Sequence, residues 1–163
     1  MSLGLYLHIP YCFSKCRYCD FYSHPGERGV PDAYVEALVR ELDRFAPERP
    51  LQPDTLYFGG GTPSLLRPEQ AKRLIDAARP LPGAEITLEA NPETVTEQSL
   101  AGFREAGVNR ISFGVQSARD TQLRTLGRPH TAKQARAAFA AARRAGFANI
   151  SGDIMLALPH YTE

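Results

Sequence analysis

The sequence predicts an α/β fold built on a parallel β-sheet of about five β/α units. Two observations predict it: short apolar segments of strand length alternate with amphipathic segments of helix length, and glycines or polar residues follow most of the predicted strands. A helix that joins two strands returns the chain across the sheet, so neighbouring strands run parallel. In barrels of β/α units the functional site lies at the carboxyl ends of the strands.

The first β/α unit begins close to the N-terminus. Residues 5–9 form a short apolar strand, and residues 31–45 have the periodicity of an amphipathic helix. Pro31 suits the first turn of this helix, because an N–H at that position would have no helical partner. The side of the helix expected to face the core carries Val35, Leu38, Leu42 and Phe45.

The second and third units follow the same order. Residues 55–58 form the second strand, and a helix begins near Pro68. Residues 85–89 form the third strand, and residues 96–106 form the helix after it. Gly107 is expected to end that helix, since glycine readily adopts the left-handed conformation that closes many helices.

The last two units contain strands at residues 110–115 and 149–156. The helical region between them is broken in its middle, and Thr131 with Gln134 predicts a capping box for its second helix, residues 132–145. The residues expected to be buried on this second helix are Ala135, Ala138, Phe139 and Ala142.

Composition and charge exclude several classes of function. The chain has 163 residues, which suits one domain with a substantial core. Its 19 basic and 18 acidic residues give a formal charge of +1, so nucleic-acid binding, which depends on a marked basic excess, is not expected. No apolar stretch approaches the roughly 20 residues of a membrane-spanning helix. The chain is therefore expected to be soluble and cytoplasmic, where thiols stay reduced.

The most informative motif contains all three cysteines of the chain, Cys12, Cys16 and Cys19, in the spacing CxxxCxxC after the first strand. Iron–sulfur clusters usually take four cysteines. Three thiolates would hold three irons of a [4Fe–4S] cluster and leave the fourth iron open, much as a catalytic zinc site keeps an open position.

Three other interpretations of the cysteines compete with a cluster. The first is a zinc site completed by His8 or His24, although structural zinc sites usually pair two short motifs and this chain has one. The second is a disulfide with one thiol left over, and the third is three ordinary core residues. Neither suits three cysteines within eight positions of a chain with no secretory signal.

Candidate site residues follow the other predicted strands as well. Three glycines, residues 59–61, follow the second strand, where they would let the backbone approach a ligand closely. Glu89 and Gln116 end the next two strands, and Asp153 lies on the last. Each residue alone also suits an ordinary turn or surface position, and Arg128 beside a proline suits an exposed loop. Their joint placement at strand ends favours a site.

Together these motifs resemble the radical S-adenosylmethionine (SAM) family, in its coproporphyrinogen III oxidase-like branch. The segments that carry the resemblance are YLHIPYCFSKCRYC, YFGGGTPSLL, LEANPE, RISFGVQS, LGRPH and GDIMLALP. The resemblance implies an incomplete (β/α) barrel of six units, of which about five are present. It also implies that residues 1–163 are the N-terminal part of a radical SAM core, with the C-terminal end of the core and a following domain missing.

The resemblance also implies cofactors and their contacts. A [4Fe–4S] cluster would be held by Cys12, Cys16 and Cys19, and SAM would chelate its open iron before cleavage to a 5′-deoxyadenosyl radical. The protein would position this cofactor pair and exclude water. The implied SAM contacts are Tyr6, Tyr18, Gly60, Gly61, Thr62, Glu89, Gln116, Arg128 and Asp153.

One position separates the two activities known in this branch. The oxidase pattern has a further cysteine two places after the third ligand, whereas this sequence has Phe21, which is typical of heme chaperones. The implied partners are heme or a porphyrin, heme-accepting proteins and an electron donor.

Two alternatives to a heme chaperone remain open at this stage. The first is an oxidoreductase of the coproporphyrinogen dehydrogenase type, so the sequence leaves enzymatic activity undecided. The second is a truncated cluster- or SAM-binding module without turnover. The ending LALPHYTE also departs from the turn that the family has after the fifth strand.

Overall fold

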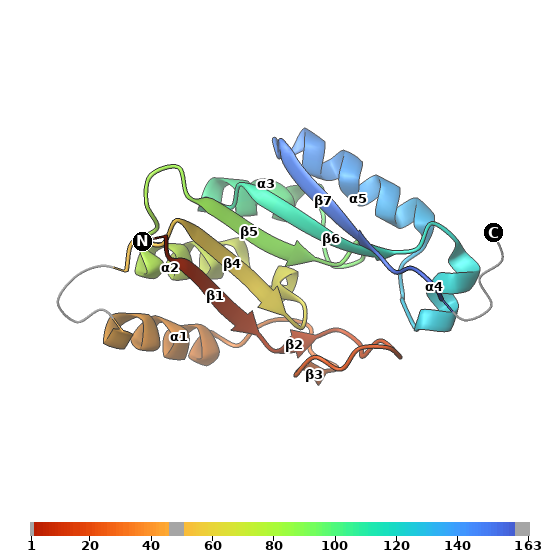
Figure 1. Ribbon diagram of the computed structural model, residues 1–163, viewed down its shortest axis with the longest axis horizontal. Coiled ribbons are helices and arrows are strands. Elements are labelled where there is room, and N and C mark those ends of the chain that lie inside the picture. Colours follow the sequence, from red (N-terminus) through yellow and green to blue (C-terminus); the bar gives the residue numbers. More distant parts are fainter. Residues whose placement is uncertain (1, 46–50, 159–163) are drawn as a thin grey trace.

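The fold is a parallel β-sheet with helices along one side, as a computed structural model of the chain shows (Figure 1). The structure describes residues 2–45 and 51–158, so the last five residues of the LALPHYTE ending lie outside the described part. The sheet has five strands in the order β1-β4-β5-β6-β7. Every neighbouring pair in it is parallel, which confirms the predicted α/β class.

The strands and helices alternate along the chain as predicted. The strands of the main sheet are β1 (Gly4–Ile9), β4 (Thr55–Gly60), β5 (Glu85–Ala90), β6 (Arg110–Gln116) and β7 (Asn149–Ile154). The helices are α1 (Asp32–Phe45), α2 (Pro68–Ala78), α3 (Glu97–Ala106), α4 (Asp120–Leu126) and α5 (Ala132–Arg144), with a 3-10 turn, η1, at Pro63–Leu65. Two short strands, β2 (Tyr11–Cys12) and β3 (His24–Pro25), pair with each other outside the sheet.

The hydrophobic core lies between the sheet and the helices. In Figure 1 α2 and α3 lie behind the sheet, and contacts between α1 and α2, α2 and α3, and α3 and α5 make a continuous helical layer. Leu56 and Phe58 of β4 are fully buried, whereas Tyr57 between them points to the other face. Phe103 of α3 is also fully buried. The helix-free face of the sheet is thus left to polar and aromatic side chains.

The local signals for helix ends are confirmed. Thr131 and Gln134 form the predicted capping box of α5, with the Gln134 N–H donating to Thr131 Oγ1 at 3.2 Å. Gly107 ends α3 in a left-handed conformation with φ of 114°. The Thr131 cap satisfies an N–H group at the start of α5, and the Gly107 N–H donates to the Arg104 carbonyl at the end of α3.

Three sequence expectations were wrong in detail. Phe45 was expected on the core-facing side of its helix, but it is 75% exposed because it lies in the last turn of α1. Phe139 is only partly buried, although its ring packs 5.0 Å from that of Phe113. The last strand ends at Ile154 rather than at residue 156, and Leu156 is 85% exposed. Within the described residues, no helix is both long and apolar enough to cross a membrane.

Candidate functional site

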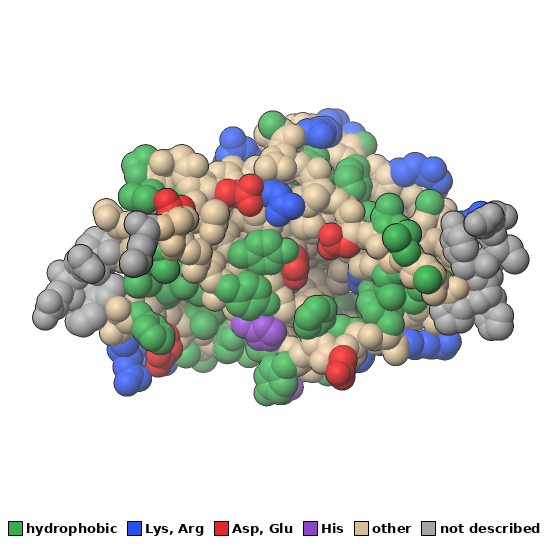
Figure 2. Space-filling model, viewed as in Figure 1, with side chains coloured by type: hydrophobic (Ala, Val, Ile, Leu, Met, Phe, Trp, Pro, Cys, Tyr) green, Lys and Arg blue, Asp and Glu red, His purple; other side chains and the backbone are tan. Residues whose placement is uncertain are grey.

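A cavity of about 320 Å³ lies where the carboxyl ends of the strands meet the cysteine loop. Figure 2 shows a hollow on the helix-free face of the molecule, with acidic side chains beside it. Parallel strands end at the same edge, so side chains far apart in sequence converge there. Of the predicted site residues, those lining the cavity are Cys12, Cys16, Tyr18, Cys19, Gly61, Thr62, Glu89, Gln116, Arg128 and Asp153.

The cysteine loop, residues 12–19, folds over one side of this cavity. Cys12 is buried in β2, while Cys16 and Cys19 are partly buried, and all three thiols are free. A turn joins the last two, because the N–H of Cys19 donates to the carbonyl of Cys16 at 3.1 Å. The Arg17 N–H donates to the carbonyl of Leu126 at 3.0 Å, which attaches the loop to the end of α4.

A single metal ion and an iron–sulfur cluster require different arrangements of the three thiols. Among the described residues, no three His, Cys, Asp or Glu side chains converge closely enough to hold one metal ion. The tetrahedral zinc site considered from the sequence, with His8 or His24, needs such convergence. The thiolates of an iron–sulfur cluster bind different irons, so they surround a volume rather than a point. Three thiols around one cavity fit that requirement.

The backbone at Gly61 lies directly against Cys12. A Cβ atom at Gly61 would come within 3.0 Å of the Cys12 sulfur and 2.7 Å of the Tyr11 carbonyl oxygen. Real side chains do not tolerate such contacts, so only glycine fits here. Next to it, the Thr62 hydroxyl donates to the Cys12 sulfur at 3.4 Å. The glycine-rich turn therefore holds the first cysteine of the loop in place.

Arg128 reaches the cavity from the loop after α4. Its guanidinium donates to Asn91 Oδ1 at 2.8 Å and to the Gly114 carbonyl at 3.1 Å. Asn91 in turn donates to the Thr62 hydroxyl at 3.2 Å, so a chain of hydrogen bonds joins Arg128 to Cys12. Among the described residues, Arg128 Nε is buried without a hydrogen-bond partner. A buried unpaired donor is costly, which suits a site completed by an anionic or acceptor group.

Tyr18 and Cys16 share this surrounding. The Arg128 guanidinium lies 5.9 Å from the centre of the Tyr18 ring, within the range of a cation–π contact. Burial raises the pKa of Tyr18 to about 12, against the opposing effect of Arg128. Burial likewise raises the pKa of the Cys16 thiol, again opposed by Arg128. Burial in the cavity therefore favours the neutral forms of Tyr18 and Cys16, and the Arg128 cation is the group that attracts negative charge.

Glu89 is the buried acid of the site. It accepts hydrogen bonds from the Tyr57 hydroxyl at 2.8 Å and from the Gly60 N–H at 3.3 Å. Burial still raises its pKa above the ordinary value, and the nearby charge of Asp153 adds to the rise. A cationic group bound beside Glu89 would reverse this effect, because opposite charge favours the ionised carboxylate.

Gln116 carries backbone strain at the end of β6. Its φ is 62°, a left-handed value that few residues other than glycine adopt, and the pairing of β6 with β7 is irregular there. The Gln116 side chain is nevertheless almost fully buried in the cavity wall. Strained backbone of this kind concentrates at functional sites, where the surrounding structure holds it in place.

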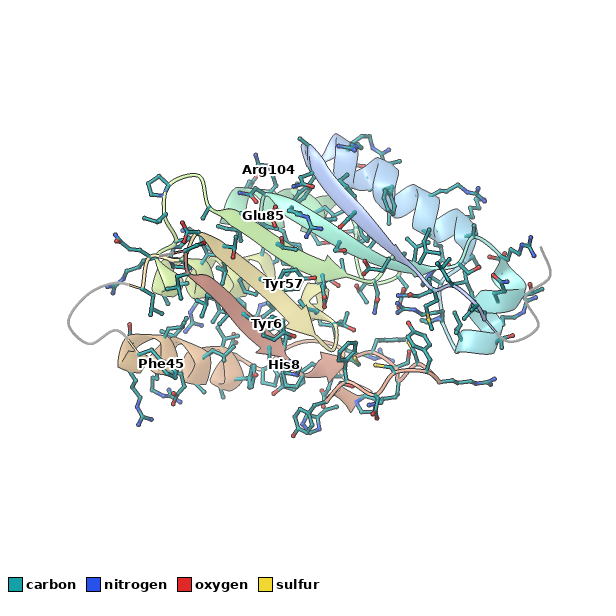
Figure 3. All side chains as sticks on the ribbon, in the orientation of Figure 1. Tyr6, His8, Phe45, Tyr57, Glu85 and Arg104 are labelled. Atoms are coloured by element: carbon teal, nitrogen blue, oxygen red, sulfur yellow. The ribbon has the colours of Figure 1, made fainter. Side chains whose placement is uncertain are left out.

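Tyr6 and Gly60 were also predicted as site residues, but neither lines the cavity. Tyr6 is 54% exposed and stacks on Tyr57 with ring centres 6.0 Å apart. Figure 3 shows Tyr6, His8 and Tyr57 close together on the helix-free face, and the Tyr6 hydroxyl lies 3.3 Å from His8 Nδ1. Gly60 acts one step away, through its N–H to Glu89.

The sequence missed several residues that build the site. Tyr57 fixes Glu89, and its place between two buried residues of β4 was a signal that it faces the other side. Asn91 holds Arg128, and its position directly after a strand was the available signal. Ser112 and Gly114 also line the cavity, because alternate residues of β6 face it.

The family comparison covers nearly the whole chain. A family model described as the radical SAM superfamily matches residues 6–163. Among curated proteins, the chain is 44% identical over 165 residues to the heme chaperone HemW of Escherichia coli, covering 96% of the chain and 43% of that protein. It is 40% identical to HemW of Bacillus subtilis, and the alignment covers 96% of the chain and 43% of that protein. The chain thus spans less than half the length of these relatives.

Solved structures give the same fold. The coproporphyrinogen III oxidase HemN of Escherichia coli, described as a radical SAM enzyme, superposes with a TM-score of 0.86 and 31% identity, over 99% of this chain and 38% of that one. HydG, a maturase of the [FeFe]-hydrogenase, superposes with a TM-score of 0.68 at 16% identity. The superposition covers 99% of this chain and 36% of the HydG chain. At that identity the second likeness concerns the fold alone.

Proposed function

The chain belongs to the radical SAM superfamily, and from that premise we propose that it is the cluster- and SAM-binding part of a heme chaperone. The observation that carries the proposal is the arrangement of Cys12, Cys16 and Cys19 around one cavity that also contains Glu89 and Arg128. A heme chaperone binds heme and delivers it to target proteins. We place this protein in the cytoplasm, with heme-accepting proteins and an electron donor as partners.

The cavity suits both parts of the cofactor pair. In this proposal the three cysteines hold three irons of a [4Fe–4S] cluster, and the contact between Gly61 and Cys12 keeps the backbone close to it. When bound, the reduced cluster supplies one electron to the sulfonium of SAM. The chain's own residues bind and orient SAM and keep water from it.

The charged groups of the cavity match the charges of SAM. Arg128, with its unpaired Nε, is suited to the methionyl carboxylate. Glu89 and Asp153 are suited to the ammonium group and the ribose hydroxyls. Tyr18 offers a ring for the adenine, Gly61, Thr62 and Gln116 complete the wall, and Gly60 contributes through its N–H to Glu89. Tyr6 lies outside this cavity, beside Tyr57, so in this proposal it contacts only a part of SAM that extends beyond the cavity.

Phe21 favours the chaperone over an oxidase. It lines the cavity and is 68% exposed, so it stands at the opening where the oxidase pattern has a further cysteine. Phenylalanine offers an apolar ring and no thiol. The similarity to proteins called heme chaperones at 40–44% identity supports the same choice. The second candidate is oxygen-independent coproporphyrinogen III oxidase, favoured by the superposition on HemN.

An electron paramagnetic resonance (EPR) experiment tests the cofactor part of the proposal. The chain is reconstituted anaerobically with iron and sulfide, reduced with dithionite and measured with and without SAM. A [4Fe–4S]⁺ signal that changes when SAM is added supports an open iron. No cluster, or a signal indifferent to SAM, overturns the proposal and leaves a truncated module without a competent site.

Heme and porphyrin assays then separate the two activities. Titration with heme, followed by its absorbance, should show saturable binding, while incubation with coproporphyrinogen III, SAM and reductant should release no carbon dioxide. Decarboxylation would instead assign the chain to the oxidase. The variant Phe21→Cys is the matched control, because it restores the oxidase pattern at one position; gain of decarboxylation in it alone would place specificity at that residue.

A further inference from the structure

The loop between α4 and α5, residues 127–131, inserts two side chains that make parallel sets of contacts. Arg128 bridges Asn91 Oδ1 at 2.8 Å and the Gly114 carbonyl at 3.1 Å. Two residues further on, His130 bridges Glu93 and the next residue of β6: its Nδ1 lies 3.1 Å from Glu93 Oε2 and its Nε2 lies 3.2 Å from the Val115 carbonyl. The same three segments are thus joined twice, by contacts that lie two residues apart in the loop and after β5 and one residue apart in β6.

The pair of His130 and Glu93 is buried. The His130 side chain is fully buried, and the Glu93 side chain is 13% exposed. Both partners of the imidazole are acceptors, so both bonds form only when the imidazole carries two protons or the carboxyl of Glu93 carries one. An imidazole with two fixed partners has a fixed orientation, and losing either partner leaves a buried polar atom unsatisfied.

The two ends of the loop are held by helix caps. Gly127 ends α4 with φ of 72°, and the Arg128 N–H donates to the Leu123 carbonyl at 2.9 Å. On the other side Thr131 caps α5, and the first N–H of that helix, at Ala132, donates to Asp120 Oδ1 at 2.8 Å. The caps fix the ends of the loop to the helices, whereas His130 fixes its middle to the sheet.

We infer that Glu93 and His130 form a buried positioning pair that holds the Arg128 guanidinium in the cavity and thereby sets the affinity for the carboxylate of SAM. The inference rests on the proposed function, since it takes SAM as the ligand. Arg128 is the residue that contacts the ligand, and the pair acts through it. Small displacements of a binding group cost much of its contribution, and the loop carries Arg128 only two residues from its buried anchor.

The test compares His130→Ala and Glu93→Ala with two controls. Glu93→Gln removes the carboxylate charge but offers an amide N–H to His130 Nδ1, while a neutral imidazole still donates from Nε2. Glu97→Ala removes a carboxylate from an exposed ion pair with Arg144, 2.9 Å long, in the neighbouring helix. Both controls should behave as the unmodified chain does.

Two measurements report on the positioning. Calorimetric titration of the reconstituted chain with SAM should show affinity about 10-fold weaker or more in His130→Ala and Glu93→Ala, the range typical when outer partners of a binding group are lost. Iron content should stay unchanged. Hydrogen exchange of the chain without cluster should be faster at residues 127–131 in the same two variants. The EPR change caused by SAM should need correspondingly more SAM.

Each outcome decides one of the two proposals. A reconstituted unmodified chain that does not respond to SAM overturns the proposed function. An unmodified chain that responds, with His130→Ala and Glu93→Ala binding SAM equally well, overturns the positioning pair alone. If His130→Ala does not fold, the two Glu93 variants decide: equal loss in Glu93→Ala and Glu93→Gln means that charge and not hydrogen bonding matters, which also overturns it.

Discussion

The helix-covered side of the sheet and its carboxyl edge, where the cavity lies, are held together by different kinds of contact. Toward the helices the core is built mainly from apolar side chains: Phe58 and Phe103 are fully buried. At the carboxyl edge the contacts are polar bonds between loops, such as those from Arg128 to Asn91 and Gly114. The difference teaches that stability and site geometry come from separate groups of residues, so substitutions should affect one without the other.

The largest expected effect is on the edge alone. Cys16→Ser or Cys19→Ser should abolish cluster assembly, because a hydroxyl is a poor substitute for a thiolate ligand of iron. Both cysteines are only partly buried, so the melting temperature of the chain without cluster should hardly change. Iron and sulfide analysis after reconstitution checks the loss, with Ser14→Ala in the same loop as control. Full cluster content in either cysteine variant would contradict the ligand assignment.

The next effect is on the helix-covered side alone. Phe103→Ala leaves a cavity in a fully buried position and should cost about 3–5 kcal/mol of unfolding free energy. Denaturant titration measures the cost. Conditions in which the variant stays folded should still give full cluster content, since Phe103 lies in α3, away from the cavity residues. A folded variant that fails to assemble the cluster would show that the two sides are coupled.

Sequence patterns predicted the helix-covered side better than the edge, for a physical reason. Burial in β4 follows the alternation of its residues, and helix caps depend on neighbours within a few positions, so Gly107 and Thr131 were predicted correctly. The convergence of the cysteines with Glu89 and Arg128 was also predictable, because parallel strands share one carboxyl edge. Phe45 was wrongly predicted to face the core, because the spacing of apolar residues does not show where a helix extends past the core.

The contacts within the edge could not be predicted from the sequence. The bond between Arg128 and Asn91 joins residues 37 positions apart, and nothing local specifies it. The left-handed backbone of Gln116 is imposed by the irregular pairing of β6 with β7. Tyr6 pairs in register with Tyr57, further back along the strands than the cavity, which explains its separation from the other site residues. Strands β2 and β3 are too short to show periodicity.

A smaller effect is expected where the two sides meet, at the glycine-rich turn. Gly61→Ala places a methyl group 3.0 Å from the Cys12 sulfur, so overpacking should cost about 1–3 kcal/mol and lower the cluster content. Gly29→Ala is the matched control, because the nearest atom to its added methyl is 4.0 Å away. Thermal melting and iron analysis of both variants measure the effect. Equal melting temperatures and iron contents in the two variants would mean that the turn accommodates the methyl group by a small shift and does not hold Cys12 in place.

The smallest expected effect concerns Glu89, because burial of its ionised carboxylate at the carboxyl edge destabilises the folded chain. Burial raises the pKa of Glu89 in the folded chain. Its contribution to stability is therefore fully present below the unfolded pKa of about 4.3 and is lost as the pH rises through the folded pKa. Glu89→Gln does not ionise, so its melting temperature relative to that of the unmodified chain should rise between pH 4 and pH 8.

The same substitution should have the opposite effect on the ligand. A carboxylate beside the cationic groups of SAM is favoured in the ionised form, so Glu89→Gln should bind SAM more weakly at pH 8 even though the free chain melts at a higher temperature. Tyr57→Phe leaves the acid in place but removes the hydroxyl whose hydrogen bond opposes the rise of the Glu89 pKa, so it should make stability depend more strongly on pH. If the melting difference between Glu89→Gln and the unmodified chain does not depend on pH, the carboxyl is not desolvated as the structure indicates. If Glu89→Gln is more stable than the unmodified chain but binds SAM more weakly, the buried acid contributes to binding through its charge.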